Sequence, residues 1–202
     1  MNRALIFGGG IYDEAFPEIL NGDYIIAADK GNEILRERGI IPHICIGDFD
    51  SSSEIPKDNV IVLPVEKDVT DSYAAAELAL EKGVGEIVIY GGMGGRPDHS
   101  LANYALIVSL TKRGVKASLV GEGYIVTAVC NGKICLSGKK GKTVSVFSYC
   151  DKSDGVTLRG LLFPLEDAVL TNGFALGVSN SFVSETAEIS VEKGVLLIMQ
   201  QI

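Results

Sequence analysis

The first 121 residues alternate between short apolar runs and stretches with helical spacing. The apolar runs fall at residues 4–7, 24–28, 44–46, 60–63, 86–90 and 116–120. The stretches with helical spacing fall at residues 13–20, 31–38, 71–82 and 98–113. Because strands that alternate with helices form a mostly parallel sheet with helices on both faces, this half of the chain predicts an α/β domain.

The pattern changes after Gly123, where short strand-like runs follow one another without a convincing helix. These runs fall at residues 124–130, 133–136, 143–149, 155–158, 168–170, 184–191 and 195–200. Asn131-Gly132 is a strong hairpin signal, and the polar run at residues 177–181 also has the composition of a turn. Seven closely spaced short strands predict a sandwich or a barrel, with the domain boundary near Glu122.

Composition and charge restrict the class of protein. The chain is 47% hydrophobic and 22% charged, which is typical of a globular protein with a real core. Its net charge of −8 repels phosphate backbones, so nucleic acid is not an expected partner. The sequence has no apolar run near the roughly 20 residues that span a bilayer, and its apolar N-terminal stretch is too short for a signal peptide. We therefore expect no membrane partner.

The four cysteines indicate the cellular compartment. Cys45, Cys130, Cys135 and Cys150 form no Cys-x-x-Cys pair, and the chain has only two histidines, so a structural zinc site is not expected. Scattered cysteines in apolar strands are typical of thiols in a reducing environment. We therefore expect a cytoplasmic protein.

The most informative polar cluster is a pair of aspartates that follows the apolar run at residues 44–46. Asp48 and Asp50 place two hard oxygen ligands where a parallel strand ends, and open α/β sheets bind ligands at that edge. Mg²⁺ prefers one or two carboxylates together with phosphate oxygens and water. A polar turn explains the local sequence equally well. Two further polar clusters after neighbouring strands favour a metal and phosphate site.

The second cluster contains Asp68, Thr70 and Asp71 at the start of a predicted helix. Thr70 is suited to cap that helix, and Asp71 in its first turn suits the helix dipole. Capping does not explain Asp68 or its neighbour Lys67. Lys67 is consistent both with neutralising a phosphate and with being a solvated surface lysine.

The third cluster spans residues 91–99 and contains four glycines in five positions. Such glycines let a backbone approach a ligand closely and present N–H groups to an anion. Arg96 adds a planar, permanently charged group that suits phosphate oxygens. Three roles are open for Asp98. It could bind a metal, accept a hydrogen bond from a substrate, or cap the helix. His99 is consistent with a general base, a hydrogen-bond donor to phosphate, or a histidine that packs at the start of the helix.

The ordered set of motifs resembles the thiamine pyrophosphokinase family over nearly the whole chain. The motifs are Asp29-Lys30-Gly31, Gly47-Asp48-Phe49-Asp50-Ser51, Lys67-Asp68-Val69-Thr70-Asp71, the run from Gly91 to His99, Gly160-Leu161 with Pro164-Leu165, and Gly177-Val178-Ser179-Asn180. The resemblance implies an α/β domain over residues 1–122, a β-sandwich over residues 123–202, and a homodimer with the active site at the subunit interface. It also implies that ATP and thiamine react, with Mg²⁺, to give AMP and thiamine diphosphate.

The resemblance further implies roles for individual residues. The implied catalytic residues are Asp48, Asp50, Asp71, Arg96 and Asp98. The implied ATP-binding residues are Asp29, Asn32, Asp48, Ser51, Asp68, Thr70, Gly94, Gly95, Arg96 and His99. The implied thiamine-binding residues are Asp71, Asp98, Ser179 and Asn180, and the implied metal ligands are Asp48, Asp50 and Asp71. The chain has no Trp, and Phe163 stands where some relatives carry one, so the aromatic group that packs on thiamine stays open.

Three other functions are compatible with parts of the sequence. One is a pyrophosphokinase that acts on another hydroxymethyl substrate, such as a pterin. Another is a Mg²⁺-dependent phosphatase with a nucleophilic aspartate, although that aspartate usually follows the first strand and Asp48 follows the third. The third is a non-catalytic sensor of thiamine or nucleotide, which would not need the full set of carboxylates.

Overall fold

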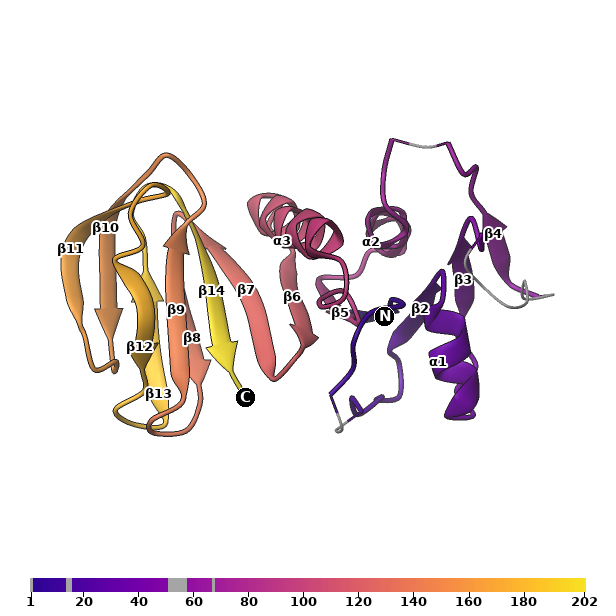
Figure 1. Ribbon diagram of the computed structural model, residues 1–202, viewed down its shortest axis with the longest axis horizontal. Coiled ribbons are helices and arrows are strands. Elements are labelled where there is room, and N and C mark those ends of the chain that lie inside the picture. Colours follow the sequence, from indigo (N-terminus) through magenta and orange to yellow (C-terminus); the bar gives the residue numbers. More distant parts are fainter. Residues whose placement is uncertain (1, 14–15, 51–57, 67) are drawn as a thin grey trace. The chain divides into compact units, whose positions relative to one another are not determined.

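The computed structural model describes residues 2–13, 16–50, 58–66 and 68–202, so Ser51 and Lys67 lie outside the described residues. These residues form a mixed α/β protein with a large sheet of ten strands and a second, antiparallel sheet of four strands (Figure 1). The predicted α/β class is confirmed at this level. The chain divides into two compact units, one formed by residues 1–106 and 115–122 and the other by residues 107–114 and 123–202.

The first unit contributes six parallel strands to the large sheet. They are β1 (Arg3–Phe7), β2 (Tyr24–Ala28), β3 (Ile44–Gly47), β4 (Val60–Val62), β5 (Glu86–Tyr90) and β6 (Lys116–Gly121), in the spatial order β4-β3-β2-β1-β5-β6. The direction of strand order reverses between β1 and β5. In open parallel sheets, ligands bind at such a reversal, outside the carboxyl ends of the strands.

Three helices accompany these strands, namely α1 (Gly31–Glu37), α2 (Asp71–Glu81) and α3 (Pro97–Lys112). The predictions of helices over residues 31–38, 71–82 and 98–113 are thus confirmed. Thr70 caps α2 as its sequence predicts, because its Oγ1 accepts a hydrogen bond from the backbone N–H of Tyr73 at 3.2 Å. In the part of the chain that the structure describes, no helix is both long and apolar enough to cross a membrane.

The predicted helix over residues 13–20 is wrong. Its described residues, 13 and 16–20, have no helical backbone. Pro17 lies in the middle of this short segment, where it donates no backbone hydrogen bond and disfavours helical geometry at Phe16. Phe16 instead stacks on Phe7 with a ring-centroid distance of 5.4 Å. Phe16 and Ile19 therefore pack on the apolar core of the first unit from a backbone that is not helical.

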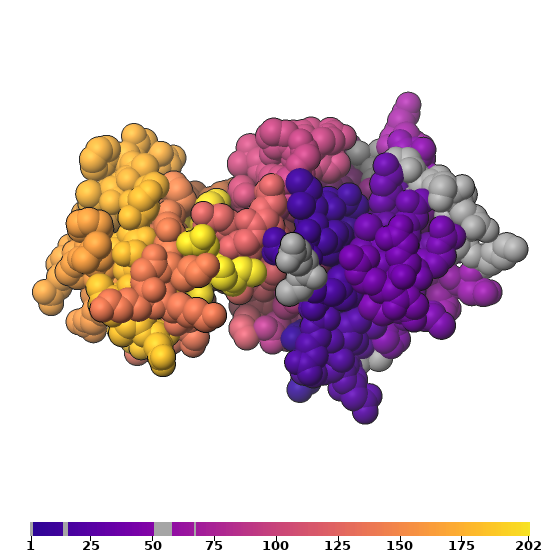
Figure 2. Space-filling model, turned by 60° about the horizontal axis from the view of Figure 1, so that its bottom comes forward, coloured from indigo at the N-terminus to yellow at the C-terminus, as the bar shows by residue number. Residues whose placement is uncertain are grey.

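The second unit contributes eight antiparallel strands to two sheets. They are β7 (Tyr124–Cys130), β8 (Lys133–Ser137), β9 (Thr143–Ser148), β10 (Lys152–Arg159), β11 (Leu165–Thr171), β12 (Gly177–Ser181), β13 (Thr186–Ser190) and β14 (Val195–Gln201). Four of these strands, in the order β12-β9-β14-β7, belong to the sheet of ten strands. The other four, in the order β11-β10-β13-β8, form the second sheet. Buried residues from both sets, including Val146, Leu158 and Ile198, form one apolar core. In Figure 2 the residues of these strands are coloured from salmon pink through orange to yellow.

The turn interpretation of residues 177–181 is wrong, because these residues form the edge strand β12. β12 pairs with β9, but the register shifts between Gly177 and Asn180. Ser179, within the shift, has a φ of +58°, a conformation more typical of turns. A short polar strand with such a bulge lacks the apolar alternation by which strands are recognised.

Candidate functional site

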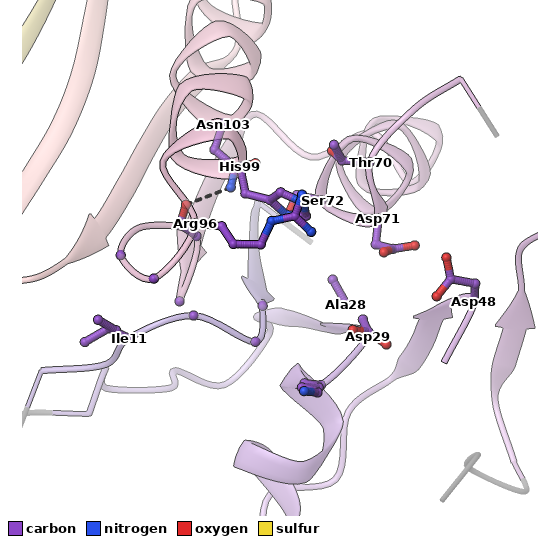
Figure 3. Close-up of a pocket in the computed structure, with 18 of the residues that line it drawn as sticks. Ile11, Ala28, Asp29, Asp48, Thr70, Asp71, Ser72, Arg96, His99 and Asn103 are labelled. Atoms are coloured by element: carbon purple, nitrogen blue, oxygen red, sulfur yellow. Dashed lines mark hydrogen bonds between the residues drawn. The ribbon is translucent and has the colours of Figure 1, made fainter. Parts of the chain in front are cut away.

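A pocket of about 750 Å³ lies in the first unit, at the carboxyl ends of the parallel strands (Figure 3). Residues that follow β1, β2, β3 and β5 line it, together with the first turns of α2 and α3. Nine residues predicted for the site line this pocket, namely Asp29, Asp48, Asp50, Thr70, Asp71, Gly94, Gly95, Arg96 and His99. A volume of this size is typical of a small-molecule site.

Three aspartates converge at one end of the pocket. Carboxylate oxygens of Asp29, Asp48 and Asp50 all lie within 4.8 Å of one another. Oδ1 of Asp48 also accepts a hydrogen bond from the backbone N–H of Asp50 at 3.3 Å. Hard oxygen donors grouped in this way suit Mg²⁺, so the described residues fit the metal that the sequence predicted. Asp29 belongs to this group, although the sequence suggested it only as an ATP contact.

Phe49 explains the orientation of the two aspartates beside it. Its side chain is buried in the apolar core of the first unit, with 5% of its surface exposed. Its φ of +55° is unusual for a bulky residue and is held by that burial. With Phe49 anchored in the core, Asp48 and Asp50 on either side both line the pocket.

The start of α2 brings a further carboxylate to the pocket. Thr70 caps the helix, which fixes the first turn that carries Asp71 and Ser72. Oδ1 of Asp71 is shielded from solvent, and Figure 3 shows its carboxylate on the same side of the pocket as that of Asp48. Asp71 thus lines the pocket beside Asp48, although it is not part of the group of three close carboxylates.

Arg96, His99 and Asn103 project from the opposite side of the pocket (Figure 3). Arg96 forms an ion pair with Asp98, which raises the pKa of the guanidinium. The hydrogen bonds from Arg96 also lower the pKa of Asp98 to about 2. Arg96 is therefore a permanent cation that faces the aspartates across the pocket.

Glycines allow the loops after β1 and β5 to lie against each other. The backbone N–H groups of Gly8 and Gly10 donate to the carbonyls of Tyr90 and Gly91, each at 2.8 Å. A side chain at Gly10 would clash, because its Cβ would lie 2.5 Å from the carbonyl oxygen of Gly91. Such glycine-rich backbone at strand ends is suited to binding phosphate.

Five residues predicted for the site are not among those that line the pocket, namely Asn32, Asp68, Asp98, Ser179 and Asn180. Asn32 accepts a hydrogen bond from the thiol of Cys45, and Asp68 is exposed before α2. Asp98 is engaged with Arg96. Ser179 and Asn180 belong to the second unit, and Ser51 lies outside the described residues. Their predicted roles stay predictions.

Asn180 is engaged with the backbone of Phe163. Its Oδ1 accepts from the N–H of Phe163 at 2.9 Å, and its Nδ2 donates to the carbonyl of Phe163 at 2.7 Å. Asn180 is 3% exposed, whereas Phe163 is 63% exposed. The buried amide thus holds the loop that presents an aromatic ring to solvent.

Sequence reasoning missed several residues that line the pocket, including Ile11, Ser72 and Asn103. Asn103 is 4% exposed, and its Nδ2 donates to the carbonyl of Gly92 at 2.7 Å (Figure 3). A signal for Asn103 existed in the sequence. It is a polar residue in a largely apolar helix, and it lies four positions after His99, so the two share a helix face.

Comparisons with known proteins agree with this arrangement. The model of the thiamin pyrophosphokinase catalytic domain matches residues 17–119, and that of the thiamin pyrophosphokinase vitamin B1 binding domain matches residues 133–196. A thiamine pyrophosphokinase of Bacillus subtilis (strain 168) is 31% identical over 183 residues, which are 87% of this chain and 86% of the relative.

Solved structures show the same fold. A crystal structure of thiamine pyrophosphokinase from Bacillus subtilis matches with a TM-score of 0.90 and 28% identity, over 99% of each chain. A thiamin pyrophosphokinase family protein from Enterococcus faecalis matches with a TM-score of 0.84 and 25% identity, over 100% of this chain and 99% of that one. The family predicted from the sequence is confirmed, and this chain belongs to the thiamine pyrophosphokinase family.

Proposed function

We propose that the protein transfers the β,γ-diphosphoryl group of ATP to the hydroxyl of thiamine in this pocket, giving thiamine diphosphate and AMP. The observation that carries this proposal is that aspartates and Arg96 lie on opposite sides of one pocket, which glycine-rich loops also line. Phosphoryl transfer depends mainly on positioning and on neutralising phosphate charge, and this arrangement offers both. The match to a vitamin B1 binding domain favours thiamine over a pterin as the acceptor.

Asp29, Asp48 and Asp50 are the residues that would hold Mg²⁺, with Asp71 beside them. Their spacing and their hard oxygens fit this metal. When bound, Mg²⁺ would neutralise charge on the phosphate oxygens of ATP. We infer that Asp29 joins the predicted ligands Asp48 and Asp50, because its carboxylate lies within the same close group.

The chain's own residues would position and stabilise the reacting groups. The thiamine hydroxyl oxygen attacks the β-phosphorus of ATP. The bond from that phosphorus to the oxygen that bridges the α- and β-phosphorus breaks, and AMP leaves with that oxygen. Arg96 would stabilise charge on the transferred group, and the backbone at Gly94 and Gly95 would lie close to the phosphates. Asp71 is better placed than Asp98 to accept the hydroxyl proton, because Asp71 lines the pocket whereas Asp98 pairs with Arg96 and does not line it.

The second unit would bind thiamine. We assign residues 1–122 to an α/β catalytic domain and residues 123–202 to a β-sandwich domain that binds thiamine and forms a homodimer. In this proposal the second domain of the partner copy completes the pocket, with Ser179 in contact with thiamine. Phe163, held by Asn180, is available to pack on a thiamine ring. Free thiols at all four cysteines fit a cytoplasmic location.

Phosphorus NMR of the purified protein with ATP, Mg²⁺ and thiamine tests the proposed function. The expected result is the joint appearance of AMP and thiamine diphosphate, with loss of ATP only when thiamine is present. Formation of ADP and thiamine monophosphate would show that the γ-phosphorus is attacked instead. No thiamine-dependent change, with turnover of a pterin, would assign the pocket to another hydroxymethyl substrate.

A further inference from the structure

We propose that Tyr12 is a positioning residue for ATP, because it holds the loops after β1 and β5 against each other. The inference rests on the proposed function, since it assigns the phosphate groups of ATP to these loops. Tyr12 itself does not appear among the residues that line the pocket, whereas Gly8, Gly91 and its own neighbour Ile11 do. Any effect of Tyr12 on ATP would therefore act through the backbone of the two loops.

The hydroxyl of Tyr12 fixes the loop after β1 by a hydrogen bond to Gly8 and lies close to the end of β5. It donates to the carbonyl of Gly8 at 2.7 Å, and it lies 3.5 Å from the carbonyl of Tyr90. Gly8 directly follows β1 and Tyr90 ends β5, so the hydroxyl lies where the two central strands end. Burial raises the pKa of Tyr12, so the hydroxyl keeps its proton and remains a donor at physiological pH.

The ring of Tyr12 packs directly on Gly91. A Cβ at Gly91 would lie 2.5 Å from Cε2 and 2.7 Å from the hydroxyl oxygen of Tyr12. Gly91 also has a φ of +62°, which glycine adopts at little cost. The absence of a side chain at Gly91 therefore has two reasons, since this backbone conformation favours glycine and the space above it is filled by the ring.

An aromatic stack also holds the ring of Tyr12. Phe16 stacks on Tyr12 at 6.0 Å between centroids and on Phe7 at 5.4 Å, and Phe7 stacks on Tyr90 at 5.4 Å. The guanidinium of Arg38 lies 4.6 Å from the centroid of Phe16. Offset aromatic pairs and cation–π contacts each favour one arrangement of the rings. The segment that follows β1 is thus anchored to the core beneath the loops.

Two variants separate positioning from stability. Tyr12→Phe keeps the ring and removes the hydroxyl, so the hydrogen bond to Gly8 is lost while the packing on Gly91 remains. Phe16→Leu weakens the aromatic stack without removing either contact to the loops. Tyr104→Phe is a matched control, because its hydroxyl donates at 3.7 Å to the Met93 sulfur, a weak acceptor, rather than to loop backbone.

The readouts are kcat and KM for both substrates, the Kd of a non-hydrolysable ATP analogue with Mg²⁺, and the melting temperature. We expect Tyr12→Phe to raise KM for ATP and the analogue Kd about three- to tenfold, the range for loss of one hydrogen bond, with KM for thiamine unchanged. We expect Tyr104→Phe to stay within about twofold, as for a weak hydrogen bond. Phe16→Leu should lower the melting temperature and leave KM for ATP near wild type.

Two results would overturn the inference. Tyr12→Phe with a lower melting temperature and an unchanged Kd for the analogue would make Tyr12 a purely structural residue. An equal loss of affinity in Tyr12→Phe and Tyr104→Phe would remove the specific role of the Gly8 contact. Wild-type protein that binds no ATP analogue would instead overturn the proposed function, so the two failures are distinguishable.

Discussion

The guanidinium of Arg96 and the carboxylate of Asp98 form a two-point ion pair, with Nε–Oδ1 at 3.2 Å and a terminal nitrogen–Oδ2 at 2.6 Å. The two residues flank Pro97, the first residue of α3. This pair restricts the directions in which Arg96 can point, although both side chains are more than 60% exposed. A ligand phosphate in the pocket must therefore share Arg96 with Asp98 or displace it.

The titration of Asp98 tests this pair. We expect the carboxyl of Asp98 to titrate near pH 2 and to return toward its ordinary value of 3.8 in Arg96→Gln. Because the folded-state pKa lies below the unfolded one, the stabilisation by this pair is present above about pH 4 and is lost as the pH falls toward 2. Carbon-detected NMR of labelled protein measures both values. A pKa near 3.8 in the wild type would show that the pair does not persist in solution.

Asp50→Asn should reduce kcat by at least about a hundredfold, because it removes one of three close carboxylates that would neutralise phosphate charge. The exposed position of Asp50 means that the fold should be unaffected, so the circular dichroism spectrum and melting temperature should match wild type. Asp58→Asn is the control, since Asp58 is exposed and is not among the residues that line the pocket. Near-normal turnover in Asp50→Asn would exclude Asp50 from the proposed metal site.

Asn103→Ala should lower the free energy of unfolding by about 1–3 kcal/mol, the cost of depriving the carbonyl of Gly92 of its buried donor. Urea denaturation measures this change. Asn103→Asp should destabilise further, because a buried carboxylate would face that carbonyl oxygen. If Asn103→Ala were as stable as wild type, the hydrogen bond to the loop would contribute nothing measurable to the fold.

Gly31→Ala should destabilise the first unit by about 2 kcal/mol or more, since its Cβ would overlap the carbonyl oxygen of Phe7 and force α1 away from β1. Gly85→Ala is the matched control, because its Cβ would meet nothing within 4 Å. Urea denaturation of the two variants provides the comparison. Equal stability would mean that α1 shifts without cost.

The cysteines should differ in reactivity. Burial raises the pKa of the Cys45 thiol to about 11, whereas Cys135 is exposed. Since the thiolate is the reactive form, iodoacetamide at pH 8 should modify Cys135 well before Cys45. Mass spectrometry of peptides after timed labelling measures the order. Early labelling of Cys45 would indicate that β3 opens readily.

Much of the fold follows from local patterns in the sequence. The parallel strands and α1 to α3 are predictable because their apolar residues recur with a period that matches the backbone geometry, and all but β4 contain buried residues. The predicted helix around Pro17 failed because Pro17 disfavours helical geometry, and Phe16 joins a stack of rings from a backbone that is not helical. β12 was missed because its residues are polar and its register shifts at Ser179.

The site was predictable where chemistry follows a strand end. Asp48, Asp50 and Arg96 all follow predicted parallel strands, and the structure brings them to one pocket. The grouping of Asp29 with Asp48 and Asp50 depends on β2 pairing with β3, which no local pattern specifies. The role of Asn180 in holding Phe163 likewise depends on contacts 17 residues apart in the chain.

The bulge in β12 also has a consequence for solubility. β12 is the edge of its strand set, and a regular edge strand presents unpaired backbone groups that recruit other chains into aggregates. The positive φ of Ser179 and the shift in register interrupt that row of backbone groups in the middle of β12. A segment shaped in this way resists edge-to-edge polymerisation at high protein concentration. Straightening it, for example by shortening the bulge by one residue, would expose the protein to that form of aggregation.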